Sequence, residues 1–367
     1  MKKQILIFCH GYNSPFVDVC NQYAAVFDRT RYEVHVAYLV GEYNAEIQQK
    51  TQADQVYFLH PAKRAVRGLK LSIIKTLLKL CREKQFEVVV CHRYKPAYIM
   101  SLVALFIKIP KIFSVMHELG TLHRRSRQLF VYLLGRKKLI FAGVSNAVRE
   151  DMLQDARFLK PTEVIVLPNV LNVPQFEQQL IEREQARREL KLANDDFVFG
   201  NIGRLVKNKD QSNLIISFAA VAKKFPQAKL IIIGTGQLEM HLKQLVEQQG
   251  VAANVIFTGF VAGAFRYVKA FDVYVSSSLQ EAFGRVLLEA MVGSVPVIAT
   301  SVHGVPEVLG NTGILVPAQQ PELLAHAMHE MLNMSAESLN ALGQRGYERV
   351  KNNFSTVQFK EQFLRLL

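Results

Sequence analysis

Short apolar runs without polar alternation recur along this 367-residue chain, and longer helical patterns lie between them. Uninterrupted runs of about four to six apolar residues predict strands that are covered on both faces, as in a parallel sheet. These runs lie at residues 4–9, 33–39, 55–59, 87–91, 112–116, 139–144 and 163–167, and then at 197–202, 229–234, 254–258, 273–276, 296–299 and 313–316. The helical patterns include residues 211–225, 237–249, 282–292 and 321–334. The alternation predicts an α/β protein with two doubly wound domains, a number that also suits its length.

The boundary between the two domains is predicted near residue 170. Pro168, Asn169 and Pro174 interrupt the pattern, and a polar helix is predicted over residues 175–192 before a new strand begins. The predicted domains are therefore residues 1–170 and 171–353. The final stretch, residues 354–367, again has a helical pattern.

The formal net charge of +14 is concentrated in the first half of the chain. Residues 1–180 contain 26 Lys and Arg against 14 Asp and Glu, whereas residues 181–367 contain 19 against 17. A basic excess confined to one half indicates a particular partner rather than general solubility. Nucleic acid, an anionic membrane surface and an anionic substrate are the candidates.

The four cysteines all lie in the first half without the spacing of a zinc site. We therefore expect buried thiols in a reducing cytosol rather than disulfides. The apolar run at the N-terminus stops after about five residues, which favours a strand over a signal peptide. No stretch reaches the roughly 18 apolar residues of a membrane span, so we expect a cytoplasmic protein that is soluble or peripheral on a membrane.

Arg204 and Lys209 lie in the turn after the strand predicted at residues 197–202, close to the start of a helix. Ligands of doubly wound sheets bind at the carboxyl ends of the strands, and a helix N-terminus with two nearby cations suits a phosphate. A solvated basic turn explains the same residues equally well, and both interpretations are open at this point.

A glycine turn, Gly234-Thr235-Gly236, follows the next predicted strand. Glu239 occupies the place of the third glycine of a dinucleotide fingerprint, which argues against an NAD-dependent enzyme. We interpret the segment as a tight strand-to-helix turn beside a nucleotide.

Two glutamates, Glu281 and Glu289, stand eight residues apart around the predicted start of a helix. Glu281 is expected in the loop or at the helix start, and Glu289 about two turns further along. Apolar residues flank Glu289, so its carboxylate is expected to be partly buried and to need hydrogen-bond donors. Sugar hydroxyls are suitable donors, and backbone amides are the structural alternative.

The segment from Glu281 to Glu289 resembles the E-x7-E signature of the family-four retaining glycosyltransferases, which have the GT-B fold. Five further segments match that family in order and together cover roughly residues 200–320. They are Gly203-Arg204-Leu205 with Lys209, Gly234-Thr235-Gly236, Glu289 to Ala299, Gly304-Val305-Pro306-Glu307 and Gly313 to Pro317. The first half matches more loosely, through Met116-His117-Glu118, Val144-Ser145 and Leu167-Pro168-Asn169.

The resemblance implies a GT-B fold, with two Rossmann-like domains facing a central cleft and residues 354–367 packed back on the first domain. It implies that Arg204 and Lys209 hold the donor diphosphate, that Glu281 faces the donor sugar, and that Glu289 accepts hydrogen bonds from the ribose. The two cations then replace a divalent metal ion, so neither a metal nor another cofactor is expected. Retention of the anomeric configuration follows from the family alone.

The remaining implied site residues are backbone positions and one histidine. Backbone amides near Phe283 and Gly284 are expected to contact the donor sugar, and His117 to lie against the transferred sugar from the first domain. The family usually has two glycines after the first strand, where this chain has only Gly11, so a donor-binding role there rests on one residue. Ala282 and His303 also replace common glycines.

Two basic segments, residues 63–84 and 123–138, mix aliphatic residues with many cations. They are either ordinary core-facing helices with solvated outer faces or a surface for anionic lipid. Because the donor is expected to bind to the second domain, we expect the acceptor to bind to the first. An anionic glycan or glycolipid acceptor at the inner membrane face, such as a lipopolysaccharide core, then explains the charge, with a UDP-sugar as the favoured donor.

Two other functions compete with this one. A transferase with a soluble acceptor has the same donor site but no need of a membrane surface. A basic nucleic-acid-binding α/β protein explains the charge, but it leaves the paired glutamates without a role and lacks interleaved aromatic residues in the basic segments.

Overall fold

The protein is described here by a computed structural model, which covers residues 2–12, 16–59 and 71–367. The chain divides into two compact units, each treated by itself below. Unit 1 is Met1–Asn169 together with Thr356–Leu367, and unit 2 is Val170–Ser355. The division therefore lies one residue before the predicted boundary, and the tail joins unit 1 two residues later than the predicted position 354.

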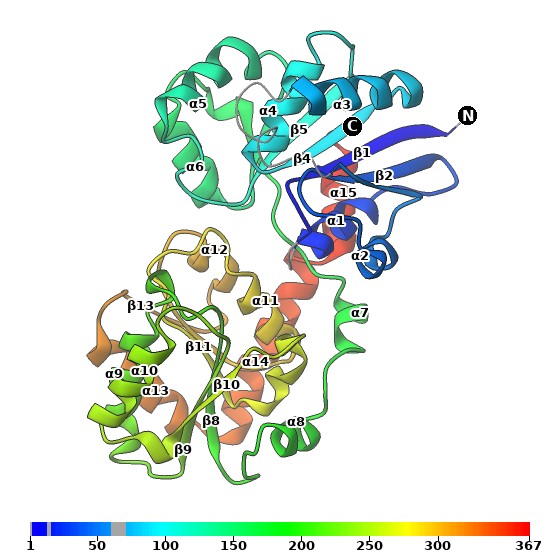
Figure 1. Ribbon diagram of the computed structural model, residues 1–367. Coiled ribbons are helices and arrows are strands. Elements are labelled where there is room, and N and C mark those ends of the chain that lie inside the picture. Colours follow the sequence, from blue (N-terminus) through cyan, green and yellow to red (C-terminus); the bar gives the residue numbers. More distant parts are fainter. Residues whose placement is uncertain (1, 13–15, 60–70) are drawn as a thin grey trace. The chain divides into compact units, whose positions relative to one another are not determined.

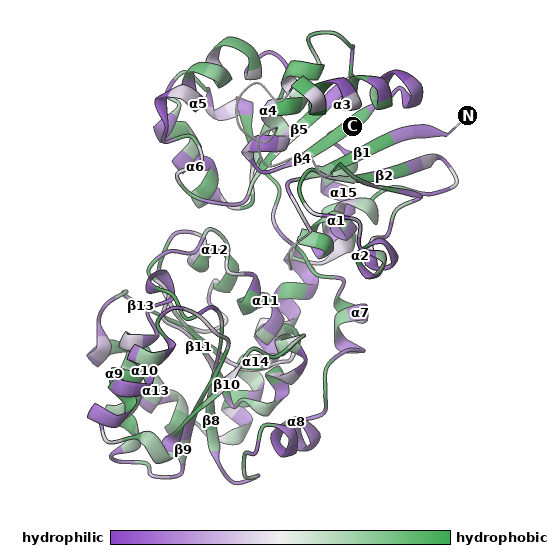
Figure 2. Ribbon diagram, in the orientation of Figure 1, coloured by the Kyte–Doolittle hydropathy of each residue, from purple (hydrophilic) through white to green (hydrophobic). Residues whose placement is uncertain are grey.

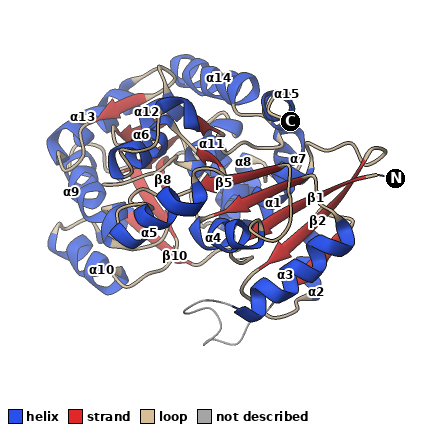
Figure 3. Ribbon diagram, turned by 90° about the horizontal axis from the view of Figure 1, so that it is seen from above, coloured by secondary structure: helices blue, strands red, loops and turns tan. Residues whose placement is uncertain are grey.

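Unit 1 is built on a parallel seven-stranded sheet in the order β3-β2-β1-β4-β5-β6-β7. In chain order the strands are β1 (Lys3–Cys9), β2 (Tyr32–Tyr38), β3 (Gln55–Phe58), β4 (Val88–His92), β5 (Lys111–Met116), β6 (Ile140–Gly143) and β7 (Val164–Val166). Central β1 pairs in parallel with both β2 and β4, and Ile7 lies opposite Val36 and Val90. Figure 3 shows β1, β2 and β5 running in the same direction.

Helices cover both faces of this sheet (Figure 1). They are α1 (Phe16–Ala24), α2 (Ala45–Lys50), α3 (Leu71–Lys84), α4 (Tyr94–Val103), α5 (Arg125–Phe130), α6 (Asn146–Asp155) and α15 (Thr356–Leu364), and a π-helical turn at Val131–Gly135 extends α5. The four cysteines are buried and free.

Helix α15 returns to unit 1 and packs there through aromatic side chains. The ring of Phe363 lies 4.9 Å from that of Phe113 on β5 and 5.4 Å from that of Tyr23 on α1. Phe359 lies 4.9 Å from the same tyrosine ring. Because both phenylalanines are buried, the tail is a part of the core of unit 1.

Unit 2 is built on a parallel six-stranded sheet in the order β10-β9-β8-β11-β12-β13. The strands are β8 (Phe197–Ile202), β9 (Ala228–Ile233), β10 (Val255–Gly259), β11 (Val273–Ser276), β12 (Val297–Thr300) and β13 (Ile314–Val316). The helices are α7 (Val173–Glu177), α8 (Arg183–Glu189), α9 (Gln211–Ala222), α10 (Glu239–Gln248), α11 (Arg285–Val292), α12 (Val305–Leu309), α13 (Pro321–Asn333) and α14 (Ala336–Asn353). In Figure 1, α9, α10 and α13 lie on one side of the sheet and α11 and α14 on the other.

The predicted fold class and all the predicted strands are confirmed, with ends that differ by one residue at most. Strands are the most hydrophobic segments of both units (Figure 2), because the sheets are covered on both faces. Phe199, Ile232, Phe218 and Met328 are buried in one core that joins the sheet of unit 2 to α9 and α13. Each such side chain contributes about 1.5–3 kcal/mol of burial free energy.

The prediction of one polar helix over residues 175–192 was wrong. Two short helices, α7 and α8, occupy this stretch. Between them the chain is irregular at Ile181, whose side chain is buried and whose N–H donates to the carbonyl of Arg266 at 2.8 Å. That tertiary contact outweighs the helical preference of the polar residues.

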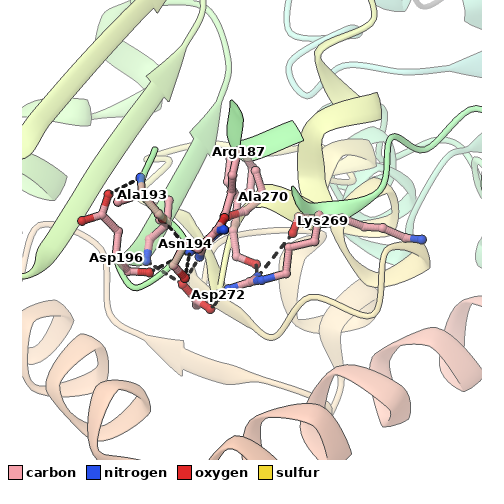
Figure 4. A network of polar contacts seen from close by, with 10 residues as sticks. Arg187, Ala193, Asn194, Asp196, Lys269, Ala270 and Asp272 are labelled. Atoms are coloured by element: carbon pink, nitrogen blue, oxygen red, sulfur yellow. Dashed lines mark hydrogen bonds and ion pairs between the residues drawn. The ribbon is translucent and has the colours of Figure 1, made fainter. Parts of the chain in front are cut away.

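Arg187 of α8 holds the amino ends of two central strands together (Figure 4). Its side chain is 1% exposed and donates to the carbonyls of Ala193, Asn194, Asp196 and Ala270 at 2.8–3.1 Å. It also pairs with Asp272, just before β11, at 2.7 Å. The same Asp272 oxygen accepts from the N–H of Val198 on β8 at 2.7 Å. One buried cation thus fixes how β8 and β11 begin.

We expect Arg187→Ala to destabilise unit 2 by about 3 kcal/mol, because the partly buried carboxylate of Asp272 and four carbonyls lose their main donor. Hydrogen exchange followed by mass spectrometry should show faster exchange in β8 and β11. Arg188→Ala, an exposed change on the same helix, is the matched control. Equal exchange in the two variants would contradict the structural role of Arg187.

Candidate functional site

The candidate site lies where the order of the strands in unit 2 reverses. Strand β8 pairs with β9 on one side and with β11 on the other. The segments after β8 and β11 therefore leave neighbouring strands at the same edge of the sheet and run to different helices. In doubly wound folds this switch point forms a crevice in which ligands bind.

Lys209 and Glu281 meet at this point. Lys209 lies just before α9, Glu281 lies in the loop after β11, and the ammonium group of Lys209 forms an ion pair with Glu281 Oε2. Both side chains are about four-fifths buried, with 23% and 22% of their surfaces exposed. In such a setting an ion pair is screened less than on the open surface.

Backbone contacts hold the two segments in register. The N–H of Leu279 donates to the carbonyl of Asn208 at 2.8 Å, and the hydroxyl of Ser277 donates to the carbonyl of Lys209 at 2.9 Å. The N–H of Gly304 donates to the carbonyl of Glu281 at 3.1 Å. The ion pair is thus set by the backbone and not by two free side chains alone.

A cavity of about 30 Å³ lies beside the ion pair, and it is lined by Lys209, Glu281, Gly284 and nine other residues. Asn201 and Gln211 are among the nine, and each has a buried side-chain oxygen without a hydrogen-bond partner among the described residues. A buried acceptor without a donor is costly, so these two oxygens favour a hydroxyl-rich ligand or water at this place.

Both glutamates act on the same buried phenol. Burial, followed by the negative charges of Glu281 and Glu289, raises the pKa of Tyr274 above its usual value. The phenol donates to the carbonyl of Ile202 at 3.3 Å. Tyr274 and Glu281 both line the cavity, and Glu289 is near enough for its charge to act on the phenol.

Helix α11 begins three residues later than predicted, at Arg285. Gly284 precedes it with φ +92°, a conformation that side chains disfavour, and a Cβ there would lie 2.9 Å from Leu287. Glu289 is consequently about one turn into the helix instead of two. Its carboxylate lies 3.4 Å from Nε of Arg285 and is 14% exposed, which confirms the predicted partial burial.

Arg204 is exposed in the loop after β8, and the glycine turn at residues 234–236 packs against the backbone of this loop. A Cβ on Gly234 would lie 2.0 Å from the carbonyl oxygen of Gly203, and one on Gly236 would lie 2.3 Å from that of Leu205. The N–H of Leu205 donates to the carbonyl of Thr235 at 3.0 Å. The predicted tight turn is confirmed, and its glycines allow two backbones to touch.

Phe283 cannot use its side chain at the site, because its ring is buried and lies 5.7 Å from that of Phe354. Its backbone and that of Gly284 lead into α11, whose first turn lacks a side-chain cap. The amides there are the kind of donor that a sugar hydroxyl or phosphate accepts.

The remaining predicted residues, His117 and Gly11, lie in unit 1. His117 follows β5, its Nε2 lies 3.0 Å from Nδ1 of buried His92, and its ring lies edge-on to Phe16 at 5.4 Å. Burial, followed by the charge of Arg93, lowers the pKa of His117 to about 3, so the ring is neutral at pH 7. Gly11 follows β1, close to residues 13–15, which lie outside the described part.

Several residues of the cavity were missed by the sequence analysis. Arg285 stands four residues before Glu289, a spacing that places two helical side chains on one face and could have revealed it. Asn201 and Tyr274 lie within apolar strands and gave no signal of their own. Among the described residues no three His, Cys, Asp or Glu side chains gather as a metal site.

The first of the two basic segments is only partly described, and the second is described throughout. Residues 63–70 of the first lie outside the described part, and its remainder is α3, which buries Ile73 and Leu77 and exposes Lys75 and Lys79. The second segment spans α5 and the turn at Val131–Gly135, and it leaves Leu129, Tyr132 and Leu133 more than half exposed.

Residues 182–349, which lie within unit 2 and contain every predicted donor-binding residue except Gly11, match the family described as Glycosyl transferases group 1. The match covers most of unit 2 and a little under half of the chain. The group 1 region includes Arg204, Lys209 and both glutamates, so the resemblance that these residues carried is confirmed at the level of the family.

Curated relatives extend the similarity into unit 1. The capsular polysaccharide biosynthesis glycosyltransferase CapM of Staphylococcus aureus is 28% identical over 298 residues, 78% of this chain and 77% of CapM. An uncharacterized glycosyltransferase of Methanocaldococcus jannaschii is 37% identical over 135 residues, but the match spans only 33% of that protein and 37% of this chain. The lipopolysaccharide core biosynthesis glycosyltransferase LpsE of Rhizobium meliloti is 29% identical over 184 residues, 49% of this chain and 52% of LpsE.

Solved structures show the fold of the whole chain. A glycosyltransferase of Rickettsia africae has a TM-score of 0.84 at 16% identity and covers all of this chain and 97% of its own. HepE of Anabaena, in complex with UDP and glucose, has a TM-score of 0.80 at 17% identity and covers 99% of both chains. The group 1 unit and its N-terminal neighbour therefore have the GT-B type of fold, as predicted.

Proposed function

We propose that this protein is a retaining glycosyltransferase that moves a sugar from a nucleotide-sugar, with a UDP-sugar favoured, to a membrane-associated anionic glycan or glycolipid such as a lipopolysaccharide core. The observation that carries the proposal is the ion pair of Lys209 and Glu281, which is about four-fifths buried at the switch point of unit 2. The ion pair places a cation for phosphate next to a carboxylate for sugar hydroxyls.

Charge separation explains why both groups are needed. As the glycosidic bond breaks, negative charge grows on the leaving phosphate and positive charge grows on the sugar ring. Arg204 and Lys209 would stabilise the phosphate, and a prearranged cation lowers the barrier without reorganisation at the moment of reaction. When the diphosphate engages Lys209, Glu281 is released to accept hydrogen bonds from the sugar, while Glu289 accepts them from the ribose. No metal ion or other cofactor is required by this scheme.

The relatives support the choice of donor and acceptor. HepE was solved with UDP and glucose, which favours a UDP-sugar here. The names of CapM and LpsE associate them with capsular polysaccharide and with the lipopolysaccharide core. A surface glycan acceptor for this chain is proposed on that basis and on the basic character of the first half.

An exposed surface on unit 1 supports the proposal that the protein binds a membrane. Leu129, Tyr132 and Leu133 are 55–60% exposed, and Arg124, Arg125 and Lys137 on the same stretch are exposed cations. Apolar residues flanked by cations are typical of segments that lie in the interface of an anionic bilayer. We name this stretch, residues 124–137, the α5 surface. The described helices are all too short or too polar to cross a bilayer.

Substitution of the two glutamates tests the donor site. Glu281→Gln should lower turnover of the UDP-sugar by about 100-fold or more, because a charged acceptor at the reacting sugar is lost. Glu289→Gln should chiefly weaken donor binding, by about tenfold, because it loses a charge-assisted hydrogen bond. Turnover is followed as UDP release with a lipopolysaccharide extract as acceptor, and donor binding by calorimetry.

Glu322→Gln, an exposed change on α13, is the matched control for these variants. The anomeric configuration of the product, determined by NMR, tests retention separately. Unchanged turnover in a folded Glu281→Gln protein would refute the assignment of the site.

Vesicle binding tests the acceptor side. We expect the chain to sediment with vesicles that contain phosphatidylglycerol and to be released by salt. Leu129→Ser combined with Leu133→Ser should weaken this binding by about tenfold or more, because two apolar side chains no longer enter the interface. Phe260→Ser, an exposed aromatic change in unit 2, should leave binding unchanged. Absence of vesicle binding by the unmodified chain would favour a soluble acceptor.

A further inference from the structure

Unit 1 has its own switch point, and a pocket of about 240 Å³ lies there. The order of the strands reverses between β1 and β4, since β1 pairs with β2 on one side and β4 on the other. His10 follows β1, Arg93 follows β4 and His117 follows β5, and all three line the pocket. Three neighbouring strands thus direct polar residues into one place, as in a binding site of a doubly wound sheet.

The lining of this pocket is strongly basic. Arg93, Lys95 and Arg127 contribute three cations, and Glu118 is its one carboxylate. Arg93 forms an ion pair with Glu118, whereas Lys95 is exposed at the start of α4. A pocket with two more cations than carboxylates is complementary to an oxyanion rather than to a neutral sugar.

Both arginines are held in place by aromatic rings. The guanidinium carbon of Arg93 lies 4.5 Å from the centre of the Phe16 ring, and that of Arg127 lies 4.7 Å from the centre of the Tyr94 ring. Arg127 also donates to the carbonyl of Thr121 at 2.6 Å. Stacked guanidinium groups are preorganised donors, so they lose less freedom when they bind a phosphate or carboxylate.

Arg93 also has a backbone conformation that residues with side chains rarely adopt. Its φ is +75° and its ψ is 164°. Arg93 is the N-cap residue of α4, but its side chain makes no capping hydrogen bond to the helix. Its Nε is buried without a hydrogen-bond partner among the described residues. Strained residues of this kind cluster at ligand sites, and a ligand oxygen would satisfy the unpaired donor.

Together with burial, the nearby positive charges lower the pKa values of the histidines in the pocket. Burial, followed by the charges of Lys95 and Arg93, lowers the pKa of His10 to about 4. Like His117, this ring is neutral at pH 7, when it can donate or accept a hydrogen bond without adding charge.

We propose that this pocket binds a phosphate or carboxylate group of the acceptor, with Arg93, Lys95 and Arg127 as its ligands. This inference rests on the proposed function, which it deepens by assigning the anionic part of the acceptor to named residues of unit 1. Arg93, Lys95 and Arg127 form a recognition site: they orient the acceptor and take no part in breaking the donor bond.

Methyl phosphate is a suitable probe, because it carries the oxyanion without a sugar, a lipid or a nucleotide. Its binding to the full chain is followed by NMR through the ring resonances of His10 and His117, at constant ionic strength set with sodium chloride. We expect saturable shifts of both histidines. Lys95→Gln should weaken this binding by about tenfold, since one charge-assisted hydrogen bond is lost.

Lys75→Gln, an exposed change on α3, is the matched control and should bind methyl phosphate like the unmodified chain. Arg93→Gln provides a second variant, which should also bind weakly. Unaltered methyl phosphate affinity in folded Lys95→Gln would overturn the proposal. So would an equal loss of UDP affinity in that variant, because the pocket would then belong to the donor.

The two proposals fail in different ways. A chain that binds methyl phosphate in this pocket but neither binds nor turns over any nucleotide-sugar would refute the proposed transferase and leave the oxyanion pocket standing. A chain that binds UDP at the site in unit 2 and shows no histidine shifts with methyl phosphate would refute the pocket alone.

Discussion

The parallel pairing of β8 with β11 is the constraint on which the candidate donor site depends. These strands are 70 residues apart in the chain, yet they lie side by side because the order of the sheet reverses between them. Lys209 and Glu281 meet only for that reason. At the opposite edge of the sheet, Arg187 and Asp272 fix the start of the same two strands, so both ends of the pair are set by charged groups. The stability of unit 2 and its chemistry therefore share one structural element.

The same rule organises unit 1 with different side chains. The reversal between β1 and β4 gathers histidines and arginines, whereas the cavity of unit 2 is lined by one lysine, one glutamate and one arginine. Burial keeps His10 and His117 neutral at pH 7, so the positive charge in this region comes from arginine and lysine. Under our proposals, the basic residues of the first half of the chain serve in part the oxyanion pocket and in part the α5 surface.

The sequence predicted the strands well, because a strand covered on both faces must be apolar along its whole length. The local sequence pattern predicted the helix boundaries wrongly where a tertiary contact sets the backbone conformation. Gly284 delays the start of α11, since the loop before it is tied to Gly304, and the contact between Ile181 and Arg266 divides the predicted polar helix. Neither contact produces a periodic pattern of apolar residues in the nearby sequence, so neither could be predicted from it.

The site residues also divide into those that a local motif predicts and those that only the tertiary structure reveals. Lys209 and the two glutamates were predicted from motifs with fixed spacing, and the structure places Lys209 and Glu281 in the wall of one cavity. Arg93 was missed, because a single arginine after a strand looks like any surface cation until its positive φ and its ring contact with Phe16 are known. The prediction for Phe283 concerned its backbone amide alone, and the buried ring agrees with that limit.

Hydrogen exchange in the presence of nucleotides tests the central claim most directly. At a concentration of about 100 times its dissociation constant, a bound ligand stabilises the site by about 2.7 kcal/mol. With UDP or another nucleoside diphosphate, our account predicts slower exchange in residues 203–210 and 277–288, the segments that carry Lys209 and Glu281. The same segments should be unaffected by NAD or by an oligonucleotide. Protection by NAD or an oligonucleotide there, with no response to any nucleoside diphosphate, would contradict the account.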